Sequence, residues 1–130
     1  MFKKTRQAKK ILVVDDDRST VMFISSILKR NGYDVITGSD GLECVEKAQS
    51  ELPDLVLLDY MMPNMNGPTA LGKIRASKNT ADIPVIMVTA TTDNDNIANA
   101  QKCGATSYIA KPIDYAILLE RIQRTLNETK

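Results

Sequence analysis

The chain has 130 residues, of which 43% are hydrophobic and 25% are charged, and its formal net charge is +1. This length suits a single domain, and so small a net charge gives no bulk electrostatic reason for direct nucleic-acid binding. The sequence contains no histidine, which excludes imidazole metal sites and hydrolysis through a Ser-His-Asp triad.

The chain begins with a segment, residues 1–8, that we expect to be a flexible basic extension. The apolar run that follows predicts a buried strand at 10–15. A helix comes next, capped by Asp17 or Ser19 and ended near Gly32, which suits the left-handed position after a helix. One face of this helix is apolar: Val21, Ile24, Ile27 and Leu28.

A second, less apolar strand is predicted at 33–37, at an edge of the sheet. Asp40 followed by Glu43 resembles a capping arrangement for the next helix, which Pro53 closes. The residues expected to point inward from it are Leu42, Val45, Ala48 and Leu52. A third strand is predicted at 54–59.

After a loop at 60–66, Gly67-Pro68 predicts the start of a helix with Leu71 and Ile74 inward. A fourth strand is predicted at 84–89.

The rest of the chain predicts a helix at 93–103 with a thin apolar face, a strand at 106–109 and a helix at 114–127. The inward residues of the last helix are Leu118, Leu119, Ile122 and Leu126.

Five strands alternating with five helices predict an α/β fold, a doubly wound parallel sheet with helices on both faces. The strand order expected for this flavodoxin-like arrangement is 2-1-3-4-5. We expect one domain over residues 9–127. Cys44 and Cys103 belong to no CxxC pair, so we expect isolated thiols. No secretory signal or membrane-length apolar run is present, and a cytoplasmic location is expected.

Carboxylates follow two of the predicted strands, and the carboxyl ends of parallel strands meet at one edge of a sheet. Asp15 and Asp16 follow the first strand, and Asp59 ends the third. Carboxylates brought together repel one another unless a cation relieves the repulsion. Without histidine or cysteine nearby, oxygen ligands favour Mg²⁺, or Mn²⁺, over zinc or copper.

Two further strand ends carry groups that suit a phosphoryl oxygen. Thr89 offers a hydroxyl at the end of the fourth strand, and Lys111 offers a fixed positive charge after the fifth. An aspartate can act as a nucleophile and form an aspartyl phosphate, and phosphoryl transfer needs mainly positioning and charge neutralisation. Each feature alone is common; their joint occurrence at strand ends favours phosphoryl transfer.

These residues resemble the response-regulator receiver domain of two-component signalling, in its single-domain, chemotaxis-regulator-like form. The resemblance covers about Lys9 to Leu126. The motifs that carry it are Ile11-Leu12-Val13-Val14-Asp15-Asp16, Asp59-Tyr60-Met61-Met62-Pro63-Asn64-Met65-Asn66-Gly67, Val88-Thr89-Ala90 and Tyr108-Ile109-Ala110-Lys111-Pro112.

The resemblance implies a metal site around a phospho-acceptor. Asp59 would accept the phosphoryl group and also bind Mg²⁺. Asp16 would bind the ion directly, and Asp15 would bind it directly or through water. The backbone carbonyl of Met61 would be a further ligand.

The resemblance also implies residues that contact the phosphoryl group and respond to its presence. Lys111 would contact the phosphoryl oxygens, and the Lys111-Pro112 peptide would be cis. Thr89 would hydrogen-bond the acyl phosphate and move toward it, so that Tyr108 rotates inward. The surface formed by 93–103, 106–109 and 114–127 would then change.

The implied partners are a sensor histidine kinase or a histidine phosphotransfer protein, and an output protein that the sequence does not identify. The implied chain is a monomer or a weak dimer through that same surface. It is not an enzyme acting on other substrates, because it catalyses only its own phosphorylation and dephosphorylation. Neither membrane association nor direct nucleic-acid binding is expected.

Three other interpretations compete. A phosphohydrolase with an aspartate nucleophile, of the haloacid-dehalogenase type, needs a second aspartate where Met61 stands. A flavodoxin-like cofactor binder would need phosphate-binding donors where Asp15 and Asp16 stand. A degenerate receiver acting only as a scaffold is disfavoured because every phosphorylation residue is present.

Overall fold

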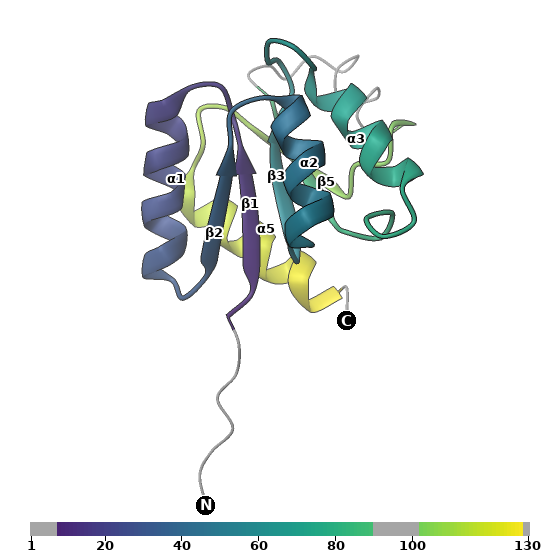
Figure 1. Ribbon diagram of the computed structural model, residues 1–130. Helices are drawn as coiled ribbons and strands as arrows, with labels where there is room; N and C mark the ends of the chain where they lie inside the picture. The colour runs from purple at the N-terminus through teal and green to yellow at the C-terminus, as the bar shows by residue number, and fades with distance from the viewer. Residues whose placement is uncertain (1–7, 90–101, 129–130) are drawn as a thin grey trace, which may run out of the picture.

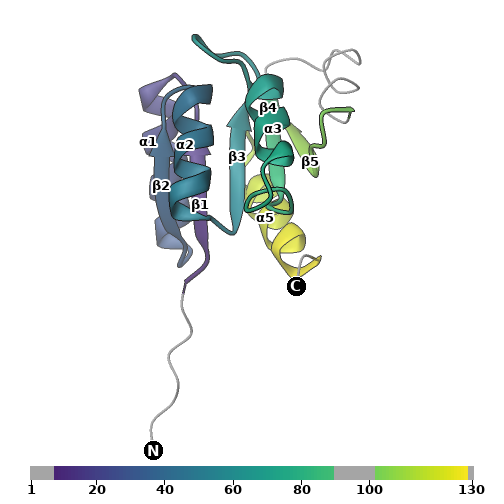
Figure 2. The same cartoon turned by 45° about the vertical axis from the view of Figure 1, so that its right-hand side comes forward.

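The computed structural model describes residues 8–89 and 102–128. Within these residues the chain forms a five-stranded parallel sheet with strand order β2-β1-β3-β4-β5, as predicted (Figures 1 and 2). Its strands are β1 (Lys10–Val14), β2 (Asp34–Gly38), β3 (Leu55–Asp59), β4 (Val85–Thr89) and β5 (Ser107–Ala110). The predicted strand limits were within one residue of these.

In the part of the chain that the structure describes, two helices cover each face of the sheet. They are α1 (Arg18–Arg30), α2 (Gly41–Glu51), α3 (Gly67–Ala76) and α5 (Tyr115–Glu128). The helices α2 and α3 pack on one face, and α1 and α5 pack on the other (Figures 1 and 2). The predicted helix at 93–103 and the predicted extension at 1–8 lie outside the described residues, apart from residues 8, 102 and 103.

The central strands are apolar on both faces because both faces are covered. On β1, Leu12 and Val14 belong to the core beneath α2 and α3, whereas Ile11 and Val13 belong to the core beneath α1 and α5. All five residues of β3 are buried. This burial explains why the sequences of these strands are continuous apolar runs, without the alternation of apolar and polar residues seen in half-exposed strands.

The helices begin where short polar side chains can satisfy the first backbone N–H groups. The carboxylate of Asp17 accepts from the backbone N–H of Ser19 at 3.0 Å, so Asp17, not Ser19, caps α1. Asn66 caps α3 in the same way, by accepting from the N–H of Thr69 at 2.9 Å.

The predicted inward face of α2 was partly wrong. Leu42 and Leu52 are 49% and 53% exposed, and the buried residues of α2 are Gly41, Cys44 and Ala48. The backbone of Gly41 packs against Met65, which sets the rotation of the helix, and Leu52 lies beyond the last turn with a left-handed backbone. Both thiols are free, Cys44 buried and Cys103 half-buried, as expected. No helix among the described residues is long and apolar enough to cross a bilayer.

Two glycines of α3 give a matched test of this packing. A Cβ at Gly67 would collide with the carbonyl oxygen of Asp59 and lie 2.8 Å from the methyl carbon of Met87, whereas a Cβ at Gly72 would meet nothing within 4 Å. We therefore expect Gly67→Ala to lower the free energy of unfolding by about 1–3 kcal/mol, as overpacking does. Gly72→Ala should raise it by about 0.5–1 kcal/mol, through helix propensity. Urea denaturation measures both, and equal effects at the two positions would contradict this packing.

Candidate functional site

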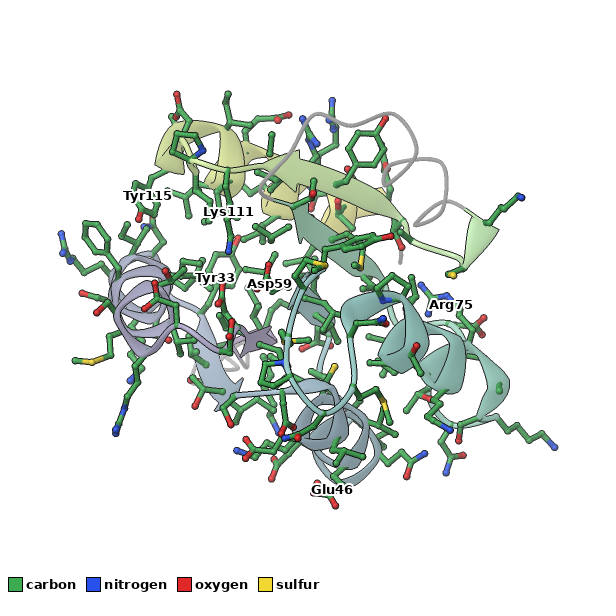
Figure 3. The ribbon with its side chains drawn as sticks, turned by 90° about the horizontal axis from the view of Figure 1, so that it is seen from above. Tyr33, Glu46, Asp59, Arg75, Lys111 and Tyr115 are labelled. Carbon is green, nitrogen blue, oxygen red and sulfur yellow. The ribbon has the colours of Figure 1, made fainter. Side chains whose placement is uncertain are left out.

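The carboxyl ends of the strands bring the predicted site residues to one edge of the sheet. Asp15 follows β1, Asp59 ends β3, Thr89 ends β4 and Lys111 follows β5. In the sheet register Asp59 lies beside Val88, and Thr89 lies beside Ala110. Seen from above, the Lys111 side chain extends from the end of β5 toward Asp59 (Figure 3).

A single ammonium group links two buried carboxylates. The Lys111 Nζ atom is 3.1 Å from Asp15 Oδ2 and 3.2 Å from Asp59 Oδ1. Asp15 and Asp59 are only 4% and 6% exposed, so water screens neither charge well. The second oxygen of Asp15 accepts from the backbone N–H of Asp17 at 2.9 Å.

Backbone hydrogen bonds also join the strand ends that carry the site. The N–H of Lys111 donates to the carbonyl of Thr89 at 2.7 Å, and the N–H of Tyr60 donates to the carbonyl of Val88 at 3.0 Å. The Lys111-Pro112 peptide is cis, as predicted. These bonds tie the residue after Asp59 to the end of β4, and the end of β4 to Lys111.

The electrostatics of the site make Asp59 hard to ionise without additional positive charge. Burial raises the pKa of Asp59 to about 6, the negative charge of Asp15 adds to this rise, and Lys111 opposes it. Burial by itself would lower the pKa of Lys111, but its hydrogen bond to Asp15 and the charges of both carboxylates raise that pKa overall. Asp59 is therefore the group whose charge state depends most on what enters the site.

The donor set of the site fits a hard divalent cation. Asp15, Asp16 and Asp59 each offer a carboxylate oxygen, and these oxygens lie within 4.8 Å of one another. Asp16 is exposed, whereas the other two are buried. Three carboxylates against one ammonium leave two negative charges unbalanced when all are ionised, and oxygen donors of this kind suit Mg²⁺.

The remaining residues predicted for the site differ in how far their side chains are exposed. The side chain of Met61 is 69% exposed, so only its backbone is suited to serve the site. Thr89 is buried, and Tyr108 is partly buried against the core beneath α2 and α3. Ala90, the last residue of the motif Val88-Thr89-Ala90, lies outside the described residues.

One feature next to the site was not predicted. The loop between β3 and α3 is tied to the start of α2, where the Asn64 side-chain amide donates to Asp40 Oδ2 at 2.7 Å. Asn64 has a left-handed backbone, with φ of 68°. Asparagine tolerates that conformation more readily than most residues do, and this was the only local signal. Its partner lies 24 residues away in the sequence.

The chain belongs to the response regulator receiver domain family, whose model matches residues 11–123. The chain is 38% identical over 122 residues to the alkaline phosphatase synthesis transcriptional regulatory protein PhoP of Bacillus subtilis. This match covers 94% of this chain and 50% of PhoP. The chain thus spans half the length of PhoP.

Solved structures agree with this assignment. The receiver domain protein from Methanospirillum hungatei superposes with a TM-score of 0.88 at 33% identity, over 94% of this chain and 96% of that one. The receiver domain of the sensor histidine kinase PA1611 of Pseudomonas aeruginosa, whose structure has a magnesium ion coordinated in its active-site cleft, gives a TM-score of 0.87 at 31% identity. That match covers 92% of this chain and 98% of the other.

The raised pKa of Asp59 predicts a pH-dependent effect of Asp59→Asn on stability without metal. The folded-state pKa of about 6 lies above the ordinary value of 3.8. The parent protein should therefore lose stability, relative to the variant, as pH rises from about 4 through about 6. At pH 7 in EDTA, Asp59→Asn should be more stable than the parent by on the order of 2 kcal/mol, and near pH 4 the difference should vanish.

Urea denaturation across this pH range is the measurement. Asp34→Asn, which alters an exposed residue of β2, is the matched control and should follow the parent at every pH. A difference between Asp59→Asn and the parent that stays constant from pH 4 to 7 would contradict the electrostatics described here.

Proposed function

We propose that this protein is a phospho-accepting response regulator in which Asp59 takes a phosphoryl group from a phosphohistidine of a partner. The observation that carries this proposal is the buried Asp59 carboxylate, ion-paired to Lys111 and close to the carboxylates of Asp15 and Asp16. The partner is a sensor histidine kinase or a histidine phosphotransfer protein, because the chain has no histidine of its own.

In the proposed reaction one carboxylate oxygen of Asp59 attacks phosphorus. The phosphorus–nitrogen bond of the phosphohistidine breaks, and the imidazole nitrogen keeps the electron pair and gains a proton. The chemistry asks for positioning and charge neutralisation rather than for a strong base. Burial of Asp59 excludes competing water from the carboxylate, and its neighbours on β1, β4 and β5 hold it in place.

The metal ligands we propose are the carboxylates of Asp15, Asp16 and Asp59 and the backbone carbonyl of Met61. Mg²⁺, or Mn²⁺ by the same donor preference, would supply the positive charge that neutralises the carboxylates and the phosphoryl oxygens. Asp16 is exposed and is the acid best placed to meet an incoming ion, while Asp15 is already engaged by Lys111.

Lys111 and Thr89 are the residues we assign to the phosphoryl group. The Lys111 ammonium is 3.2 Å from Oδ1 of Asp59, so after phosphorylation it would be close enough to bind the phosphoryl oxygens. The Thr89 hydroxyl, at the end of the neighbouring strand, would donate to the same group.

The signalling step we propose is a two-state switch. Phosphorylation adds about 1.5–2 negative charges, and movement of Thr89 toward them would let Tyr108 rotate inward. Tyr108 is half-buried on the edge strand β5, so an inward rotation would bury more of its side chain. The surface that changes would be formed by 93–103, β5 and α5, and an output protein, or a second copy in a weak dimer, would read it.

The setting of this function is also a proposal. We infer a receiver domain over residues 9–127, preceded by the basic segment 1–8 and acting in the cytoplasm. We expect no action on other substrates, no membrane association and no direct nucleic-acid binding. The alternative, a phosphohydrolase with Asp59 as nucleophile, has no second acid at Met61 and is not favoured.

Labelling tests the phospho-acceptor directly. With Mg²⁺ and radiolabelled acetyl phosphate, the parent should take up about one phosphoryl group per chain, because Asp59 is the only nucleophile proposed. Asp59→Asn, or the parent in EDTA, should take up none, whereas the control Asp34→Asn should match the parent. Label that persists in Asp59→Asn would refute the assignment, and steady turnover of phosphate esters would favour the hydrolase.

The switch makes a separate prediction for amide spectra. In Mg²⁺ and acetyl phosphate, the amide resonances of Tyr108 and of α5 should shift in the parent, because the phosphoryl charge alters their packing. The same additions should leave Asp59→Asn almost unchanged. Two-dimensional NMR is the measurement, and identical spectra for the two proteins would show that no switch is coupled to Asp59.

A further inference from the structure

The loop between β3 and α3, residues 60–66, leads away from Asp59 and carries Met61. Its first and last residues are held close together, because the N–H of Gly67 donates to the carbonyl of Tyr60 at 2.8 Å. Gly67 has no room for a side chain against Asp59. Between these two ends the path of the loop, and so the direction of the Met61 carbonyl, depends on other contacts.

Met62 and Met65 pack on the core, and two further contacts come from the N-terminal end of α2, over which the loop lies (Figures 1 and 3). The N–H of Gly41 donates to the carbonyl of Met65 at 3.1 Å, and the approach is so close that a Cβ at Gly41 would overlap the backbone of Met65. The Asn64 amide donates to Asp40 Oδ2 at 2.7 Å. A backbone contact and a side-chain contact therefore fasten the far side of the loop.

The two carboxylate oxygens of Asp40 accept hydrogen bonds from different partners. Oδ1 accepts from the N–H of Glu43 at 2.9 Å and so caps α2, whereas Oδ2 holds Asn64. The hydrogen bond from Glu43, and then that from Asn64, lower the pKa of Asp40, so the carboxylate stays ionised and both bonds are charge-assisted. The left-handed backbone of Asn64, with φ of 68°, is the conformation in which this contact is made.

We propose that Asp40 is a positioning residue for the divalent-cation site: by binding Asn64 it fixes the loop that presents the Met61 carbonyl. This inference rests on the proposed function, in which that carbonyl is a metal ligand. Asp40 itself does not ligate the ion. It ties the start of α2 to the loop after Asp59 and so helps to order that loop before a metal ion binds.

Two substitutions separate this role from helix capping. Asp40→Ser keeps an N-cap side chain, because serine caps helices about as well as aspartate, but it cannot reach the loop in the same way. Asn64→Gly keeps the left-handed backbone without strain, removes the amide and changes no charge. Because Asn64→Gly is neutral, any effect it shares with Asp40→Ser is not a long-range charge effect. Asp34→Ser is the control for removing an exposed aspartate.

The measurement is the Mg²⁺ dissociation constant from isothermal titration calorimetry, with urea denaturation in EDTA beside it. Asp40→Ser and Asn64→Gly should each weaken Mg²⁺ binding by about tenfold, the lower end of what outer-sphere contacts contribute. The double variant should be no weaker than either single one, because both remove the same bond. Stability in EDTA should change little, and Asp34→Ser should bind Mg²⁺ as the parent does.

The outcomes distinguish this inference from the proposed function. If both variants bind Mg²⁺ within a factor of two of the parent, Asp40 does not position the site, although the site itself stands. If stability in EDTA falls in both variants while Mg²⁺ affinity holds, the bond between Asp40 and Asn64 supports the fold but does not position the metal site. If the parent binds no Mg²⁺ and Asp59→Asn behaves identically, the proposed function fails instead.

Discussion

The Lys111 ammonium shared between Asp15 and Asp59 is the interaction on which the rest of the site depends. It joins groups that follow three different strands, and it is possible only because a parallel sheet directs all its carboxyl ends to one edge. Burial and the charge of Asp15 raise the pKa of Asp59, and Lys111 opposes this rise only in part. With Asp16 added, the three carboxylates outnumber the single ammonium group, and a divalent cation would supply the missing positive charge.

The fold keeps these groups still. Every residue of β3 is buried, and β3 lies at the centre of the sheet between β1 and β4. Apolar side chains from α2 and α3 on one face, and from α1 and α5 on the other, pack against it. Asp59 therefore lies at the end of a strand that is enclosed on both faces, whereas Tyr108 belongs to the edge strand β5 and Lys111 follows it.

The sequence pattern predicted the sheet and its acidic edge because both follow from local composition. Apolar runs that end in aspartate mark buried parallel strands, and their alternation with helices dictates the topology. The burial of Asp15 beside the exposed Asp16 was not predictable, because it depends on where β1 ends relative to Lys111. The face of α2 was mispredicted for a similar reason: Gly41 packs on Met65, a contact that periodicity does not contain. The bond between Asp40 and Asn64 likewise joins two loops 24 residues apart.

A crystal structure of the protein with Mg²⁺ and trifluoroberyllate, a mimic of the bound phosphoryl group, tests the central claim most directly. We expect beryllium on a carboxylate oxygen of Asp59, the ion bound by Asp16 and Asp59, and Lys111 and Thr89 against the fluorines. A mimic bound to another residue, or an ion away from these aspartates, would contradict it.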